Sequence, residues 1–320
     1  MNTKSIFYLT ISLFTFHLSY AQPVNNLTYP TGYQTAELGQ LKIEQFGEGE
    51  RPFLLIADVG FTGNYFNNFL EGNSANFDFH VVTLPGTTEL AGYTIPSGSY
   101  ANHSWLNAID LALYRYVSNK NLKEMIIGGH LVIATHVALS FALKHPDIIS
   151  HTIIMSGQPY ASWPSPKDPS GKTPVSIEER KGSIDYFMAP RFYKTISKED
   201  WNKGLYQPQH YSPNIGIGNE LYQQTTTASM PVMIQMLCEY FTTDFSLQFD
   251  QVSVPTLILQ PDFSNEYLAK NPTHQALFYD YWDAAKSNSN FTFKTISNAR
   301  LSLGYEQIEL VSMAIQDFIR

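Results

Sequence analysis

Cysteine is almost absent from the 320-residue chain, which contains only Cys238. A single cysteine excludes an internal disulfide, so the fold has to be stabilised by burial and not by cross-links. Cys238 lies in the apolar run 230–241, where a small buried side chain is more typical than a reactive thiol. Cysteine pairs and the His-x-x-x-His spacing of zinc sites are also missing, so the sequence predicts no metal site.

Basic residues are scarce, because 20 Lys and Arg stand against 28 Asp and Glu and give a formal net charge of -8. This excess of acids argues against nucleic acid or an anionic lipid surface as the partner. Phosphate-binding glycine loops are absent as well, since Gly128-Gly129 precedes His130 without the spacing of a nucleotide cradle. We therefore expect a small molecule as the partner and no cofactor.

Long uncharged apolar stretches are missing after the N-terminus. Residues 1–21 contain a lone Lys4, an apolar stretch over 6–16 and then Ser19-Tyr20-Ala21, which is the layout of a cleavable secretory signal. The apolar part is shorter than the roughly 20 residues that cross a bilayer. The sequence thus predicts a secreted or periplasmic mature protein, residues 22–320, without a stable membrane anchor.

Short apolar runs that end in turns predict buried strands, and two longer periodic stretches predict helices. The expected strands cover 53–57, 79–84, 124–128, 152–156, 256–260 and 291–296, and the helices cover about 132–143 and 307–319. Strands buried on both faces and alternating with helices indicate an α/β protein with a mostly parallel central sheet flanked by helices.

The composition changes between 158 and 251, where Pro, Tyr, Trp and Lys follow one another in irregular order. We interpret this segment as a lid inserted between two parts of one core, 22–157 and 252–320. Its aromatic side chains could line a pocket for an apolar or ring-bearing ligand. Alternatively, most of them pack the lid onto the core.

Several local motifs, in this order, resemble the α/β-hydrolase superfamily over nearly the whole mature chain. Leu54-Leu55-Ile56 followed by Gly60-Phe61 looks like the strand and oxyanion loop of that family. The other matching motifs are Thr83-Leu84-Pro85-Gly86, Lys144-His145-Pro146-Asp147, Val254-Pro255-Thr256-Leu257 and Ile296-Ser297-Asn298-Ala299-Arg300. The resemblance implies an α/β-hydrolase fold with an inserted lid, and a serine, a histidine and an acid as the catalytic triad.

The nucleophile of this family stands on a strained strand-to-helix turn, Gly-x-Ser-x-Gly, with small residues on either side of it. Here the turn reads Gly129-His130-Leu131, which places Leu131 at the nucleophile position. Counting back from His145-Pro146 places Val132 there instead. Neither side chain can attack a carbonyl. His130 also precedes the nucleophile position in active members, so it is expected to pack beside the turn.

The other two triad positions have changed as well. The motif that leads to the histidine continues Arg300-Leu301, so Leu301 falls on the base. After the seventh strand of the family, counting places Ser264 on the acid and leaves Asp262 two residues early. A triad that reads Leu131 or Val132, Ser264 and Leu301 fits lost or redirected chemistry.

Displaced residues could in principle rebuild a site. Thr135 and His136 follow the turn, and Ser156 with Asp262 is a remote alternative nucleophile and acid, but no well-placed histidine joins them. Asp58 precedes the oxyanion loop, where its charge would oppose an oxyanion if it pointed inward. The more typical position for such a residue faces solvent or caps a turn.

Two functions from different classes fit these observations. The first is a secreted pseudohydrolase that binds a small apolar or aromatic ligand in a lidded pocket beside Gly60, Phe61, His130 and Val132. The alternative is a hydrolase of a small ester, amide or lactone, or a non-hydrolytic enzyme, that uses relocated residues. A weaker third interpretation is a folding or assembly partner that uses only its surface.

Overall fold

The computed structural model describes residues 42–86, 99–161 and 175–320, so the predicted signal at 1–21 lies outside the described residues. A 7-stranded sheet in the order β1-β3-β2-β4-β5-β6-β7 forms its centre. The strands are β1 Lys42–Phe46, β2 Arg51–Ile56, β3 Phe77–Thr83, β4 Met125–His130, β5 Ile149–Met155, β6 Thr256–Pro261 and β7 Phe291–Ile296. β1 pairs antiparallel with β3, and the other pairings are parallel.

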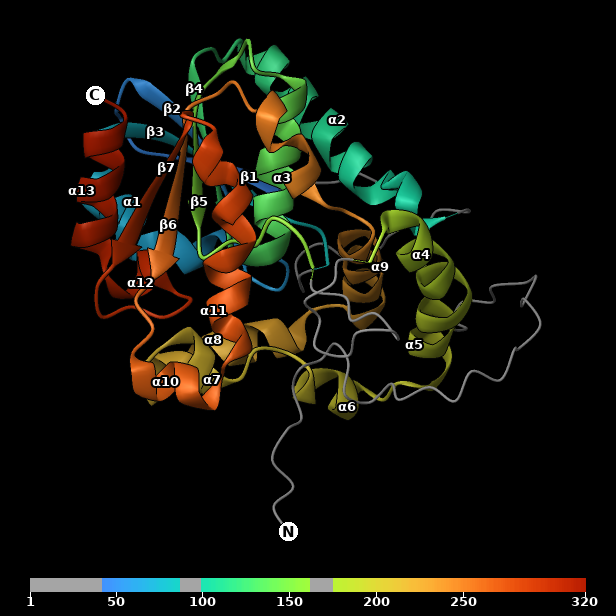
Figure 1. The fold of residues 1–320 in the computed structure, drawn as a ribbon. Coiled ribbons are helices and arrows are strands. Elements are labelled where there is room, and N and C mark those ends of the chain that lie inside the picture. Colours follow the sequence, from blue (N-terminus) through green and yellow to red (C-terminus); the bar gives the residue numbers. More distant parts are fainter. Residues whose placement is uncertain (1–41, 87–98, 162–174) are drawn as a thin grey trace.

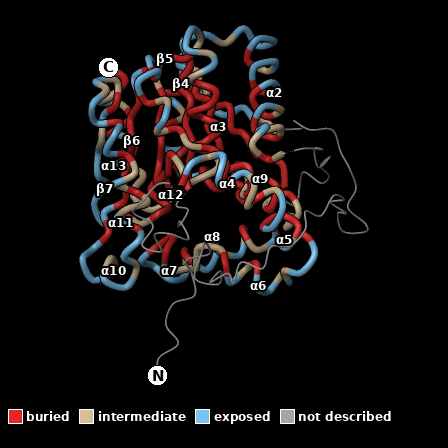
Figure 2. The backbone as a smooth tube through the Cα atoms, turned by 45° about the vertical axis from the view of Figure 1, so that its right-hand side comes forward, coloured by how far each residue is buried: buried red, intermediate tan, exposed pale blue. Residues whose placement is uncertain are grey.

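The central strands are buried on both faces, which explains their continuous apolar runs (Figure 2). Alternate residues of β2 enter two different clusters, with Leu54 and Ile56 on one face and Phe53 and Leu55 on the other. Helices α2 (Ser104–Lys120) and α3 (Leu131–Lys144) cover the first face. Helices α1 (Asn67–Asn73) and α13 (Ile308–Phe318) cover the second face (Figure 1).

Between β5 and β6 the described chain folds into helices rather than an irregular segment. These are α4 Ile177–Ser183, the π-helix η3 Ile184–Met188, α5 Ala189–Thr195, α6 Lys198–Lys203, α7 Pro208–Tyr211, α8 Ile215–Thr227, α9 Met230–Phe241 and the 3-10 helix η4 Phe245–Gln251. Helices α6 to α8 lie beyond the carboxyl ends of the strands (Figure 1). We call residues 175–251 the helical insertion.

The remaining short elements connect the core. They are η1 Gly63–Phe66, η2 Tyr100–Asn102, α10 Asn265–Lys270, α11 Thr273–Phe278, η5 Asp280–Ser287 and α12 Leu303–Glu306. The predicted fold class, a mostly parallel sheet flanked by helices, is confirmed. The boundaries of the lid at 158 and 251, and its action as a lid, stay predictions. β1 was not predicted from the sequence.

Candidate functional site

The turn between β4 and α3 keeps the backbone shape of a nucleophile elbow. Leu131 stands on it with φ 64°, in the left-handed region that a leucine rarely adopts. An added Cβ at Gly129 would lie 2.4 Å from the Ala134 carbonyl oxygen, so only glycine fits where strand and helix pass each other. The structure therefore places Leu131, and not Val132, at the elbow position.

The two leucines of the altered triad lie in one apolar cluster. Leu131 and Leu301 are both buried there, together with Phe61 and Tyr65. The Leu301 N–H donates to the carbonyl oxygen of His210 at 3.3 Å, which joins this loop to α7. The positions of nucleophile and base thus hold packed hydrocarbon without a proton acceptor.

The residue at the position of the catalytic acid also differs from that of an active triad. Ser264 is exposed and caps α10, where its side chain accepts a hydrogen bond from the Tyr267 N–H at 3.2 Å. Asp262 is also exposed. Both side chains are therefore open to solvent, whereas Leu131 and Leu301 are buried.

His130 lies beneath the elbow as a structural residue. Its Nε2 lies 2.9 Å from the Tyr65 hydroxyl and 3.0 Å from the Leu301 carbonyl oxygen. Since that carbonyl can only accept, Nε2 carries the proton. The ring also stacks on Tyr65 at 4.3 Å between centroids, and burial lowers the pKa of His130 to about 3. A neutral, fully buried imidazole therefore holds these segments together.

The candidate relocated residues do not assemble into a second site. The Thr135 hydroxyl donates to the carbonyl oxygen of Leu131, and His136 packs between Tyr240 and Phe245. Ser156 is buried with φ 51°, and its hydroxyl has no hydrogen-bond partner. Among the described residues, no hydrogen bond joins Ser156 to a histidine or an acid.

Asp58, directly after β2, fills the start of α3 with its carboxylate. Its Oδ2 accepts from the Val132 N–H at 3.2 Å, and its Oδ1 accepts from the N–H groups of Ile133 at 3.0 Å and Ala134 at 3.2 Å. Asp58 is only 9% exposed, so the expectation of a solvent-facing side chain was wrong, whereas the capping role is observed at a helix.

Burial dominates the electrostatics of Asp58 and raises its pKa from 3.8 to about 7, although the backbone N–H groups of Val59 and residues 132–134 oppose the shift.

In serine hydrolases the N–H after the nucleophile is one of the donors of the oxyanion hole. Here that donor, Val132 N–H, already binds a carboxylate. The sequence left the orientation of Asp58 open, and its only signal there was an acid at the end of a buried strand.

The predicted oxyanion loop packs against the helical insertion. Gly60 has φ 92°, and an added Cβ there would lie 3.0 Å from the Thr225 Cα in α8. Phe61 is buried and contacts Tyr65 and Tyr211 edge-on or tilted, with centroids 5.0 and 6.0 Å away. The loop therefore supports the packing between core and insertion.

A polar bridge of two buried side chains and one half-buried side chain lies between the insertion and the end of β5. Gln158 donates through Nε2 to the Tyr206 hydroxyl at 2.8 Å and accepts through Oε1 from the Tyr240 hydroxyl at 2.8 Å. Besides burial, the charge of Asp58 contributes to the raised pKa values of both tyrosines.

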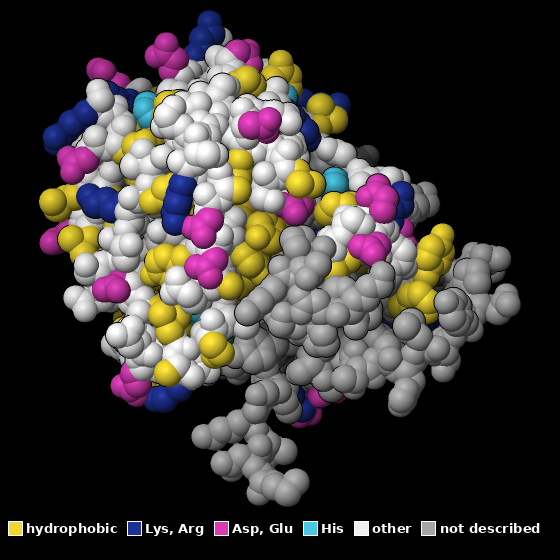
Figure 3. Space-filling model, in the orientation of Figure 1, with side chains coloured by type: hydrophobic (Ala, Val, Ile, Leu, Met, Phe, Trp, Pro, Cys, Tyr) yellow, Lys and Arg dark blue, Asp and Glu magenta, His cyan; other side chains and the backbone are white. Residues whose placement is uncertain are grey.

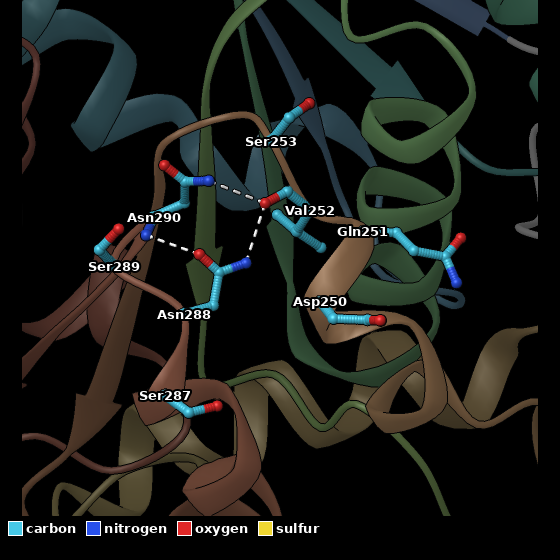
Figure 4. Close-up of a pocket in the computed structure, with 8 residues that line it drawn as sticks. All are labelled: Asp250, Gln251, Val252, Ser253, Ser287, Asn288, Ser289 and Asn290. Carbon is cyan, nitrogen blue, oxygen red and sulfur yellow. Dashed lines mark hydrogen bonds between the residues drawn. The ribbon is translucent and has the colours of Figure 1, made fainter.

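An open surface depression occurs at the opposite end of the sheet (Figure 4). It is lined by residues 250–253 and 287–290, just before β6 and β7 begin. Asn288 and Asn290 both donate there to the Val252 carbonyl oxygen, at 3.0 and 2.9 Å. Ligands of open α/β sheets bind at the carboxyl ends of the strands, so this depression is not the candidate site.

The part of the chain that the structure describes contains no group of three or more His, Cys, Asp or Glu placed to hold a metal ion. Within the same residues, no helix combines the length and the apolar character needed to span a membrane. On the face shown in Figure 3, acidic and basic side chains are dispersed among one another.

The chain resembles several solved structures of bacterial proteins, among them an esterase. An esterase from Thermogutta terrifontis is 19% identical with a TM-score of 0.62, covering 88% of this chain and 93% of its own. MenH from S. aureus is 20% identical with a TM-score of 0.60, covering 87% and 97%. A bromoperoxidase from Bacillus anthracis is 15% identical with a TM-score of 0.59, covering 87% and 95%.

No protein-family model matches the chain, and no curated protein sequence matches it either. The structural resemblance extends over most of the chain and most of each neighbour. The protein therefore has the α/β-hydrolase fold, as the motifs predicted. At these sequence identities the resemblance establishes the fold and leaves the activity to the residues of the site.

Proposed function

We propose that the protein is a secreted pseudohydrolase that binds a small apolar or aromatic ligand between its core and its helical insertion. One observation carries this proposal: the Asp58 carboxylate occupies the N–H groups at the start of α3. A carbonyl oxygen that became an oxyanion there would find no free donor and would meet a negative charge. Leu131 and Leu301 support the proposal, because neither can replace a serine or a histidine.

Retention of the elbow without its chemistry also favours a binding role. Active hydrolases store strain at the nucleophile turn because the exposed hydroxyl needs it. In this chain the same strained turn carries a buried leucine. Secretion is part of the proposal through the apolar N-terminal segment, and N-terminal sequencing of the exported protein should begin at Gln22.

A fluorophosphonate probe tests the proposal, because it labels only an activated serine. We expect no labelling of the native protein beyond that of a heat-denatured control. Leu131→Ser should also remain unlabelled, since Leu301 provides no base and Asp58 still fills the donor site. Clear labelling of the wild-type protein that Ser156→Ala abolishes would overturn the pseudohydrolase and favour the alternative, a hydrolase with relocated residues.

A further inference from the structure

Two buried histidines face each other where the helical insertion contacts the C-terminal part of the core. His210 belongs to α7, which lies beside α10 and α11 (Figure 1), and is 7% exposed. Its ring lies edge-on to the ring of His274 in α11, with 5.1 Å between the centroids, and His274 is 6% exposed. The hydroxyl of Tyr267 in α10 lies 2.8 Å from Nδ1 of His274. Imidazoles from distant parts of the sequence therefore form the centre of this contact.

One hydrogen bond determines where a further proton on His210 has to bind. The backbone N–H of Gln207 donates to Nδ1 of His210 at 3.0 Å, across the first turn of α7. Because an N–H group can only donate, Nδ1 carries a lone pair, and the proton of the neutral ring is on Nε2. A second proton must bind Nδ1, where it would face the Gln207 N–H and break this hydrogen bond.

The groups that face His210 from the surrounding elements offer no negative charge. The rings of Tyr206 and Tyr267 lie edge-on to it, with centroids 6.0 and 6.3 Å away. The Arg300 guanidinium lies over the Tyr267 ring, 4.6 Å from its centroid. Among the described residues, no Asp or Glu forms an ion pair with His210 or His274. Burial, together with the charge of Arg300, lowers the pKa of His210 to about 4.

The carboxyl groups of the neighbouring helices are bound elsewhere. Glu306 of α12 accepts from the Ser212 hydroxyl at 2.6 Å and from the Arg300 N–H at 2.9 Å. The carboxyls on α8 and α10 are exposed and have other partners, namely Glu220 with the Tyr305 hydroxyl and Glu266 with Lys270. A proton on either buried histidine would therefore be a cation without an anionic partner, which is unfavourable in a buried position.

Helix α7 holds the loop that carries Leu301. The Leu301 N–H donates to the carbonyl oxygen of His210 at 3.3 Å, and the Ser302 N–H donates to that of Tyr211 at 3.2 Å. The Arg300 guanidinium donates to two further carbonyl oxygens, those of residues 209 and 212. The short helix that His210 stabilises at its first turn therefore connects the helical insertion to the position of the lost base.

We propose that this contact is an acid-sensitive switch, in which a proton on Nδ1 of His210 releases α7 from the loop 300–302 and opens the helical insertion beside the elbow. The switch is a property of the fold and goes beyond the proposed binding function, because it requires no bound ligand. The central sheet stays folded when the contact opens.

The direction of the pH dependence follows from the two histidines. Burial lowers the pKa of His210 to about 4 and that of His274 to about 3 in the closed contact, against 6.5 for an exposed histidine. The closed contact is therefore fully stabilised above about pH 6.5 and is weakened as the pH falls below it. Between pH 7 and 5 each histidine should increase the equilibrium constant for opening by about 20-fold.

Hydrogen exchange of the chain without its predicted signal tests the switch, with protection factors measured at pH 7 and 5. We expect the protection of the Leu301 and Ser302 amides to fall by at least about 100-fold, because both histidines contribute. At pH 5 these amides should remain less protected than those of β4, which report global unfolding.

His210→Gln is the decisive variant, because glutamine at this third helical position accepts from the Gln207 N–H without titrating. It should reduce the fall in protection by about 20-fold. The matched control is His151→Gln in β5, a half-buried histidine that packs on Phe318 and should leave the fall unchanged.

The wild-type measurement decides the matter even if His210→Gln fails to fold. Equal protection of Leu301, Ser302 and the β4 amides at pH 5 would overturn the switch, because the histidines would then act only through global unfolding. A fall of less than about 3-fold, or the same fall in His210→Gln as in the wild type, would overturn it as well. None of these outcomes depends on the fluorophosphonate result, which tests the pseudohydrolase separately.

Discussion

At the residue scale, Asp58 stabilises the start of α3 by accepting three backbone N–H groups. Asp58→Ala leaves these donors without a protein acceptor, so we expect the free energy of unfolding to fall by about 1–3 kcal/mol. Asp58→Asn retains a carbonyl acceptor of the same shape and should lose clearly less. Urea denaturation followed by circular dichroism at neutral pH measures both changes. An Asp58→Ala variant as stable as the wild type would contradict this role.

The residues of the candidate site differ in how far the sequence could predict them. Offsets from neighbouring motifs left Leu131 or Val132 for the elbow position and gave Leu301 for the base. The contact of Asp58 with Val132 spans 74 residues, and no local pattern encodes it. The sequence left three alternatives for Asp58, which were to point inward, to face solvent or to cap a turn. The structure shows a buried side chain that caps the start of α3.

At the element scale, Glu239 of α9 joins the helical insertion to the core. Its Oε1 and Oε2 accept from the N–H groups of Trp105 and Leu106 at 2.9 and 3.0 Å, which caps the start of α2. We expect Glu239→Ala to accelerate hydrogen exchange of these two amides by about 10-fold or more, because it removes their acceptor. Glu239→Gln retains an oxygen and should have a smaller effect.

The control for Glu239 is Glu199→Ala in α6, where an exposed ion pair with Lys203 contributes little. Unchanged exchange at Trp105 and Leu106 in Glu239→Ala would show that packing alone fixes α9 on the core.

Strand β1 is the one strand of the sheet that was not predicted from the sequence. β1 reads Lys-Ile-Glu-Gln-Phe with no residue buried, so its edge position depends on pairing with β3 and not on an apolar run.

The central strands, in contrast, could be predicted to within a few residues because burial on both faces demands continuous apolar sequence. The helices of the insertion could not be predicted from the sequence, which showed only a change of composition. These short helices depend on caps and on contacts with the core, such as Ser302 N–H with the Tyr211 carbonyl oxygen at 3.2 Å. Amino-acid composition predicts neither the helix caps nor the contacts with the core.

At the scale of the whole molecule, burial shifts the pKa values of many titratable groups, and the shifts have opposite effects on how stability depends on pH. It lowers the pKa values of four histidines from 6.5 to about 3 or 4, namely His130, His136, His210 and His274. It raises the pKa values of two carboxyls, Asp58 and Glu239, to about 7. Between about pH 4.5 and 6.5 the unfolded chain binds protons on the histidines, and the folded chain binds protons on the carboxyls.

The histidines outnumber the carboxyls, so the unfolded state binds more protons in this range and stability falls as the pH is lowered. The lowered pKa values of His80, His103 and His151 act in the same direction, and the raised pKa of Glu306 opposes them. We expect the free energy of unfolding to drop by at least about 2 kcal/mol between pH 6.5 and 5, since one proton per pH unit corresponds to about 1.4 kcal/mol. Urea titrations across this range measure the slope, and His274→Phe should reduce it by about one proton. A slope of zero or of opposite sign would mean that the carboxyls, with Asp58 among them, control the pH response of the fold.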